Sequence, residues 1–203
     1  MIHRIYSTFS KKGVFVGGKH LLKYIYYHYK EKYEFVYFYV DMKSIPYGLS
    51  QKNNSINVRI ASHDDVQKIV LDVYPFLSSK EENDKRYIEK IGENYLKCFI
   101  AEQDGVIIHY SLLFERAKES PLMKTAIDKS NVFPNDAYLG TVFTVPSARG
   151  MWVVPEVLLN ILVYLNSCYN KRRLYAIVHI KTPGAVAYYK RLGFTRILKQ
   201  KTL

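Results

Sequence analysis

The loop at residues 149–155 has the pattern in this sequence that best suits the binding of an anion. An apolar run at residues 138–145 precedes it, and a second apolar run at residues 157–165 is long enough for a helix. A glycine-bearing loop between a strand and a helix start presents unpaired backbone N–H groups and the positive end of the helix dipole. We therefore expect the loop to bind a phosphate group, although Trp152 occupies a position that favours a smaller residue.

Hydrophobic periodicity and turn residues predict the elements that position this loop. Asp104 and Gly105 separate two β-rich runs and predict a hairpin. Pro155 fits the first position of the helix after the loop. Residues 115–135 are expected to form a loop-rich insertion that shapes a substrate pocket. The predicted strands lie at residues 57–60, 98–102, 106–113, 138–145, 174–180 and 194–198, and the predicted helices begin near residue 63, cover residues 78–95, run from the loop through residue 164 and cover residues 184–192.

The first part of the chain, residues 1–55, is basic, whereas residues 56–156 are mildly acidic. Residues 19–33 predict an amphipathic helix that either packs on its own domain or lies on an anionic membrane surface. Residues 34–40 are dense in β-forming residues and predict a strand, and residues 46–54 have the composition of a linker. We predict a basic N-terminal extension of helix plus strand at residues 1–55 and a second unit at residues 56–203.

The 203-residue chain has a globular composition and a net charge of +12. Residues 157–203 contain nine Lys and Arg and no Asp or Glu. Such charge suits a polyphosphate cofactor, an anionic membrane or nucleic acid, or serves solubility alone, and no motif that recognises nucleic acid accompanies it. The two cysteines form no C-x-x-C pair, no apolar run reaches membrane-spanning length and no signal peptide is evident. We expect a reducing, cytoplasmic location, with peripheral membrane contact through the basic N-terminus as an alternative.

Residues 56–198 resemble the GNAT superfamily of N-acyltransferases in the order of their elements and in two motifs. Residues 147–152 resemble the family's acyl-CoA loop, written Q/R-x-x-G-x-G/A. Residues 185–194 resemble its terminal segment, A-x-x-F-Y-x-K-x-G-F, and are the stronger match. The resemblance implies an α/β (α+β) fold with a mixed, mostly antiparallel central sheet flanked by helices, here with an N-terminal helix–strand extension.

Three positions depart from the family pattern. Ser147 begins the loop motif in place of Gln or Arg, Trp152 replaces its second glycine, and Thr182 stands where the family has Asn. A glycine lets the backbone approach a pyrophosphate closely, so Trp152 must turn its side chain away or crowd the cofactor. These departures leave open a GNAT-shaped domain with a damaged cofactor site.

The resemblance implies acetyl-CoA or another acyl-CoA as co-substrate, and no metal. Backbone N–H groups of the loop would hold the pyrophosphate, the end of the preceding strand would pair with the pantetheine, and the Val145 N–H would polarise the thioester carbonyl. The cofactor-binding residues that it implies are Phe143, Thr144, Val145, Arg149, Gly150, Met151, Trp152, Val153, Val154 and Thr182. The basic residues Lys171, Arg172, Arg173 and Lys181 would meet the adenosine phosphates or form a solvated turn.

Tyr189 matches the family's tyrosine that protonates the departing thiolate, a role that suits a phenol. Its neighbour Tyr188 is expected in the core. The strand before the loop offers no carboxylate, so the general base stays open among His109, Glu115, Asp136 and a water relay. A histidine in an apolar strand is more often structural, and a pKa near neutrality is the argument for His109 as the base.

The sequence thus favours an acyl-CoA-dependent N-acyltransferase, N-acetyl in the first instance, that acts on a small amine. General similarity to GNAT proteins with N-terminal extensions from surface-polysaccharide clusters suggests an amino sugar, including a nucleotide-linked one, as the acceptor. The alternative is a catalytically weakened GNAT-like binding module that engages a membrane or an acidic partner. We expect no nucleic-acid partner, and a homodimer is compatible with the sequence.

Overall fold

In the computed structural model, the described residues are 35–44, 55–77, 82–93, 95–125, 127–168 and 172–197. The predicted helix at residues 19–33 and the predicted linker at residues 46–54 lie outside these ranges. No helix in the described ranges is long and apolar enough to cross a membrane.

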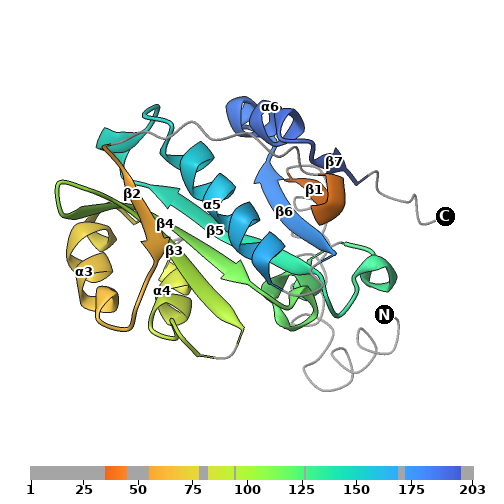
Figure 1. Cartoon of the computed structure of the whole chain (residues 1–203), viewed down its shortest axis with the longest axis horizontal. Helices are drawn as coiled ribbons and strands as arrows, with labels where there is room; N and C mark the ends of the chain where they lie inside the picture. The colour runs from red at the N-terminus through yellow and green to blue at the C-terminus, as the bar shows by residue number, and fades with distance from the viewer. Residues whose placement is uncertain are drawn as a thin grey trace, which may run out of the picture.

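A seven-stranded sheet runs through the molecule in the order β2-β3-β4-β5-β6-β1-β7 (Figure 1). Every neighbouring pair is antiparallel except β5 and β6, which are parallel. The predicted mixed, mostly antiparallel sheet is therefore confirmed. The strands are β1 (Phe35–Asp41), β2 (Asn57–Ile60), β3 (Leu96–Gln103), β4 (Val106–Phe114), β5 (Ala137–Thr144), β6 (Arg173–His179) and β7 (Thr195–Arg196).

Four α-helices among the described residues flank the sheet: α3 (Asp65–Asp72), α4 (Glu82–Ile88), α5 (Val153–Ser167) and α6 (Pro183–Arg191). Ring contacts place α4 and α5 on opposite faces of the sheet. Tyr164 of α5 meets Phe99 of β3 edge to face, whereas Tyr87 of α4 meets Phe114 of β4. Phe99 pairs with Ser111, which lies an odd number of residues from Phe114, so the two phenylalanines point to opposite faces. Helices α5 and α6 cover one face together (Figure 1).

Short 3₁₀ segments complete the connections. The insertion between β4 and β5 is built from three of them, and its apolar residues form a second core cluster with Tyr37, Tyr138 and Tyr175. The 3₁₀ segments are Met42–Ser44, Tyr74–Phe76, Ala117–Glu119, Pro121–Lys124, Lys129–Asn131 and Pro146–Ala148.

The predicted hairpin between β3 and β4 is present. Asp104 and Gly105 both have positive φ, 50° and 80°. Two consecutive left-handed residues match the right-handed twist of the flanking strands, and aspartate and glycine tolerate that conformation.

Strand β1 occupies an interior place in the sheet. It pairs antiparallel with all of β6, from Phe35 opposite His179 to Asp41 opposite Arg173, and on its other side with β7. Phe38 is fully buried in the main core. The strand expected in the N-terminal extension is therefore present, and it shares one sheet and one core with the residues after position 55.

Two helix boundaries differ from the predictions. Helix α5 begins at Val153, so Pro155 is its third residue and not its first. The first N–H groups of a helix have no partner within it, so proline is tolerated at this position too. Helix α4 covers Glu82–Ile88 in the described residues and ends before the predicted helix at residues 78–95 does, since turns follow Ile88 before β3.

We predict that Phe38→Ala lowers the free energy of unfolding of the whole chain by about 3–5 kcal/mol, because it empties a fully buried ring site. Urea unfolding followed by circular dichroism measures this. Leu71→Ala is the control, since Leu71 is 74% exposed and its loss should cost less than about 0.5 kcal/mol. An unchanged main transition in Phe38→Ala would contradict the place of β1 in the shared core.

Candidate functional site

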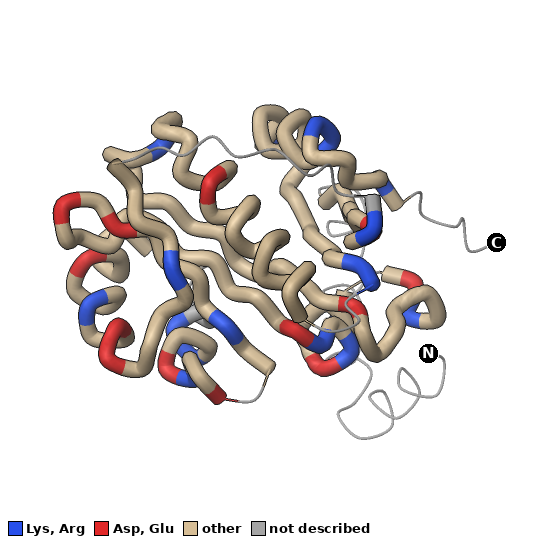
Figure 2. The backbone as a smooth tube through the Cα atoms, in the orientation of Figure 1, with Lys and Arg blue, Asp and Glu red and all other residues tan. Residues whose placement is uncertain are grey.

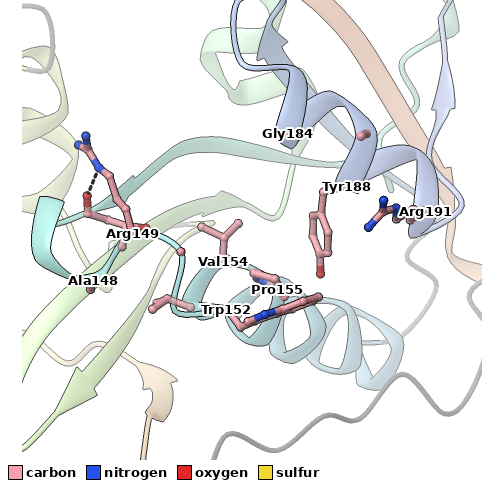
Figure 3. Close-up of a pocket in the computed structure, with 12 residues that line it drawn as sticks. Ala148, Arg149, Trp152, Val154, Pro155, Gly184, Tyr188 and Arg191 are labelled. Carbon is pink, nitrogen blue, oxygen red and sulfur yellow. Dashed lines mark hydrogen bonds between the residues drawn. The ribbon is translucent and has the colours of Figure 1, made fainter.

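A groove of about 380 Å³ lies between the start of α5 and the face of α6 (Figure 3). Strand β5 contributes Thr144 at its floor, and the loop before α5 forms one wall. The lining residues are Thr144, Ala148, Arg149, Gly150, Trp152, Val153, Val154, Pro155, Gly184, Ala187, Tyr188 and Arg191. The structure thus brings together the predicted loop and the predicted terminal helix.

The groove lies where β5 and β6 separate. The two strands pair only from Ala137–Leu139 to Leu174–Ala176, and within the described residues no pair joins them beyond that point. A bulge sits at the same place, because the register of β5 against β4 shifts between Leu139 and Val142. Gly140 lies in this bulge, and an added Cβ would approach the Phe114 ring to 2.9 Å. The sheet therefore opens toward the C-terminal ends of β5 and β6.

Backbone groups of β5 face this gap. The Val145 N–H donates to the Ile108 carbonyl at 3.0 Å, so Val145 faces β4. Successive residues of a strand point their N–H and C=O groups to opposite sides, so those of Thr144 and Val142 face the gap. The expectation that the Val145 N–H points at a ligand is therefore wrong, because that N–H pairs within the sheet. The N–H at this end of β5 that faces the gap is that of Thr144.

The backbone at the start of α5 has a geometry that suits an anion. Gly150 has φ 88°, and Trp152, the N-cap residue, has φ 61°. In the described part of the chain, no backbone carbonyl accepts the N–H groups of Trp152, Val153 or Val154. Three open N–H groups at the positive end of a 15-residue helix suit a phosphate or pyrophosphate.

Two arginines add positive charge to the groove. Arg191 of α6 points toward Tyr188, whereas Arg149 turns toward the end of β5 (Figure 3). The Arg149 Nε donates to the Thr144 carbonyl at 3.1 Å. Helix α6 carries no acidic residue, and no acidic side chain among the described residues lines the groove. Glu156, in the first turn of α5, is the acidic residue whose charge acts on Tyr188, and further acidic residues lie around α3 and α4 (Figure 2). The charge around the groove therefore favours an anionic ligand.

A buried hydrogen-bond chain runs from Ser111 through His109 to Thr144. The His109 Nε2 lies 2.8 Å from the Ser111 Oγ, and its Nδ1 lies 2.7 Å from the Thr144 Oγ1. His109 is fully buried, and this burial lowers its pKa from 6.5 to about 3. Both ring nitrogens already have hydroxyl partners, and an imidazole of such low pKa is a poor proton acceptor. His109 therefore orients Thr144 and does not suit the role of general base.

The structure reverses the expected places of the two tyrosines of α6. Tyr188 lines the groove, whereas Tyr189 is buried between Phe38, on which it stacks, and Phe194, which it meets edge to face. Helix rotation explains this, since adjacent residues project about 100° apart. Burial raises the pKa of the Tyr189 phenol. Burial and the charge of Glu156 raise the pKa of Tyr188 to about 12.

The other base candidates lie away from the groove. Glu115 accepts a hydrogen bond from the Tyr164 hydroxyl near the C-terminal end of α5. Asp136 precedes β5, at the end of the strand opposite the groove, where it is fully buried and accepts from the Phe133 N–H. Burial raises the pKa of Asp136. Neither carboxylate is placed to take a proton from a ligand in the groove.

Several predicted phosphate ligands lie elsewhere too. Thr182 donates its hydroxyl to the His179 carbonyl in the turn before α6 and does not line the groove. Arg172 lies over the Phe133 ring at 4.0 Å, and Arg173 lies over Tyr39. These arginines sit at the start of β6, opposite the groove. Lys171 lies outside the described residues.

Of the remaining predicted cofactor residues, Gly150, Val153 and Val154 line the groove. Phe143 is buried and stacks on Tyr110, and Met151 is partly exposed beside the loop. Neither of these two side chains lines the groove.

Sequence reasoning missed the groove-facing side of α6. Gly184, Ala187, Tyr188 and Arg191 recur at intervals of three and four residues, which places them on one helix face. Two small residues there keep the groove wide, and the tyrosine and arginine supply its polar groups. This spacing was the available signal.

A family model described as the acetyltransferase (GNAT) family matches residues 63–194, which is more than half of the chain. The chain belongs to the GNAT acetyltransferase family. No sequence among curated proteins matches it. The GNAT fold is also found in the solved structures that resemble the chain.

Three of these structures illustrate the likeness. The glucosamine N-acetyltransferase region of a fungal multi-domain β-N-acetylglucosaminidase has a TM-score of 0.62 at 13% identity, over 81% of this chain and 20% of that one. A Drosophila protein has a TM-score of 0.58 at 12% identity, over 81% and 48%. An aminoglycoside 6′-N-acetyltransferase from Acinetobacter baumannii has a TM-score of 0.50 at 12% identity, over 73% and 98%. At these identities the likeness is one of fold, and the chain spans under half the length of the first two.

We predict that acid destabilises this GNAT domain through His109. The pKa of His109 is about 3 in the folded protein and about 6.5 in the unfolded chain. Below pH 6.5 the unfolded state therefore binds more protons, so the free energy of unfolding falls as the pH falls from 6.5 toward 3, by up to about 1.4 kcal/mol per pH unit.

Urea unfolding between pH 7.5 and 4.5 measures this slope. His109→Gln has no such titration and should flatten the slope. His63→Gln removes an exposed histidine and should leave the slope as it is. Equal slopes in the wild type and His109→Gln would show that His109 is not buried as a neutral ring.

Proposed function

We propose that this chain is an acyl-CoA-dependent N-acyltransferase that moves an acetyl group from acetyl-CoA to a small amine. The observation that carries the proposal is the opening between the parallel strands β5 and β6 beside the open N–H groups of α5. An extended thiol arm can pair with strand edges in the opening while its phosphates bind the helix start. Membership of the GNAT family supports this donor.

The donor would be held by backbone groups at one end and by cations at the other. In this proposal the N–H groups of Trp152, Val153 and Val154 bind the pyrophosphate, and Arg191 binds a further phosphate oxygen. Arg149 exchanges its contact with the Thr144 carbonyl for a phosphate. Acetyl-CoA supplies an activated thioester carbonyl at the strand opening.

The reaction then needs one nucleophile, one oxyanion donor and one acid. The neutral amine attacks the thioester carbon, a C–N bond forms, and negative charge develops on the carbonyl oxygen. The Thr144 N–H faces the gap and is the proposed donor to that oxygen. As the C–S bond breaks, Tyr188 gives its proton to the sulfur. The ammonium proton leaves to water, and the Tyr188 phenolate regains a proton from water before the next turnover.

Tyr188 is our proposed acid because it lines the groove. With a pKa of about 12 it stays protonated at every pH at which the domain is expected to work. The same shift makes it a weaker acid than a free tyrosine, so proton transfer must accompany C–S cleavage. Tyr189, the tyrosine that matches the family motif, has its ring packed against Phe38 and Phe194. A water relay is the proposed route for the ammonium proton, since His109 is buried with a low pKa and Glu115 and Asp136 lie away from the groove.

An amino sugar, free or nucleotide-linked, is the acceptor class that we propose to test first. The resemblance to GNAT proteins of surface-polysaccharide clusters supports this choice.

The alternative function is a GNAT-like binding module without catalysis, which engages a membrane or an acidic partner through its basic ends. Binding of acetyl-CoA separates the two, because a binding module of that kind has no need of the cofactor.

We predict that acetyl-CoA at 100 times its Kd stabilises the chain by about 2.7 kcal/mol, which raises its Tm by several degrees. Arg191→Ala should weaken acetyl-CoA binding about tenfold, because it removes a charge-assisted contact to phosphate. Arg196→Ala, which removes an exposed arginine of β7 outside the groove, should bind as the wild type does. No thermal shift with acetyl-CoA at millimolar concentration would favour the binding module.

We predict that Tyr188→Phe lowers kcat by about 100-fold, with little change in KM for acetyl-CoA, because it removes the proton donor and keeps the ring. Thiol release with a panel of amines and amino sugars measures kcat. Tyr189→Phe is the matched variant on the next residue and should retain near wild-type kcat. A loss confined to Tyr189→Phe would return the acid role to the motif position.

A further inference from the structure

Trp152 is a bulky residue in a backbone conformation that few residues adopt. Its φ of 61° and ψ of 15° are left-handed, and its side chain is 60% exposed. The only other non-glycine residue with positive φ in the described ranges is Asp104, in a hairpin turn where aspartate is common. A glycine would satisfy the same backbone without strain. The fold therefore gives no packing reason for tryptophan here.

The indole forms one wall of the groove. Figure 3 shows the Trp152 ring beneath Pro155, with the Tyr188 hydroxyl pointing toward it from α6 and Arg191 beyond. Among the described residues the ring has no stacking partner and its N–H has no hydrogen-bond acceptor. An exposed aromatic face thus lies next to open N–H groups and an arginine.

A flat ring beside a phosphate site suits a nucleotide. Nucleobases stack on aromatic side chains, and the arginine and the helix start bind the phosphates that the base carries. We propose that Trp152 is the stacking platform for the adenine ring of the acyl donor, and so makes the site selective for CoA thioesters over thioesters of pantetheine phosphate that carry no nucleotide. This inference rests on the proposed function and names the feature of the donor that the site recognises.

A nucleotide-linked acceptor could supply the same chemistry. The groove favours the donor, because Trp152 contributes both its ring and its N–H to one continuous site with Val153 and Val154. Base and phosphates of a single ligand would then meet adjacent groups of the protein. The experiment includes a probe for each source.

Trp152 is the only tryptophan in the chain, so its fluorescence reports on the groove alone. Adenosine 3′,5′-bisphosphate, which is the nucleotide part of CoA, should quench this emission with saturation, and excess CoA should compete with it. Uridine diphosphate should need a concentration at least tenfold higher to reach half-maximal quenching. Equal or stronger quenching by uridine diphosphate would assign the ring to a nucleotide-linked acceptor and overturn the proposal.

Donor selectivity provides the second measurement. The wild type should use acetyl-CoA with a kcat/KM at least tenfold above that for S-acetyl-4′-phosphopantetheine. Trp152→Ala should reduce this ratio about tenfold, through KM for acetyl-CoA, and Trp152→Phe should restore most of it because phenylalanine keeps a stacking face. Because the ring is largely exposed, these variants are expected to fold, and circular dichroism checks this.

Three further outcomes, all in Trp152 variants, would overturn the proposal. If Trp152→Ala lowers kcat/KM for both donors by the same factor, the ring contacts the pantetheine arm and not the adenine. Trp152→Gly that tightens acetyl-CoA binding shows that the ring obstructs the groove. Unchanged selectivity in Trp152→Ala shows that the ring is not used. Quenching by adenosine 3′,5′-bisphosphate without thiol release from any donor would contradict the proposed transferase activity and still support a nucleotide site at Trp152.

Discussion

The short parallel pairing of β5 and β6 is the constraint on which the site depends. Three residue pairs hold these strands together at one end, and the bulge around Gly140 turns β5 away from β6 beyond Leu139. The crossover helix α5 must begin where β5 ends, so its open N–H groups come to the mouth of the gap. One local interruption of the sheet thus accounts for the opening, the unpaired strand edge of Thr144 and the place of the open N–H groups of α5 beside it.

The aromatic core beneath α6 sets what enters that opening. Tyr189 packs between Phe38 and Phe194, which fixes the rotation of α6 on the sheet. This rotation turns Tyr188 and Arg191 toward α5. Phe38 comes from β1, so the N-terminal strand takes part in orienting the groove although it contributes no side chain to the lining. Sequence distance therefore hides a structural dependence between residues before position 55 and the site.

Local patterns predicted most of the fold. The Asp104–Gly105 hairpin, the strands around it and the helix after the loop all follow from turn chemistry and periodicity. Local sequence patterns did not predict that β1 lies between β6 and β7, because strand order depends on long-range pairing. In the site, the sequence pattern located the loop correctly. It placed Tyr189 in the groove and Tyr188 in the core, whereas the structure has them the other way round. A motif shows which residues are present, whereas packing against Phe38 decides which of the two neighbouring tyrosines faces the groove.

We propose that an acyl-CoA lies across the start of α5 with its thioester between β5 and β6. A crystal structure of the full chain with CoA tests it most directly. We expect pyrophosphate oxygens within hydrogen-bond distance of the Trp152, Val153 and Val154 N–H groups, and the CoA sulfur nearer to the Tyr188 hydroxyl than to that of Tyr189. CoA bound outside this groove, or a Trp152 ring that fills the groove and excludes the pyrophosphate, would contradict it.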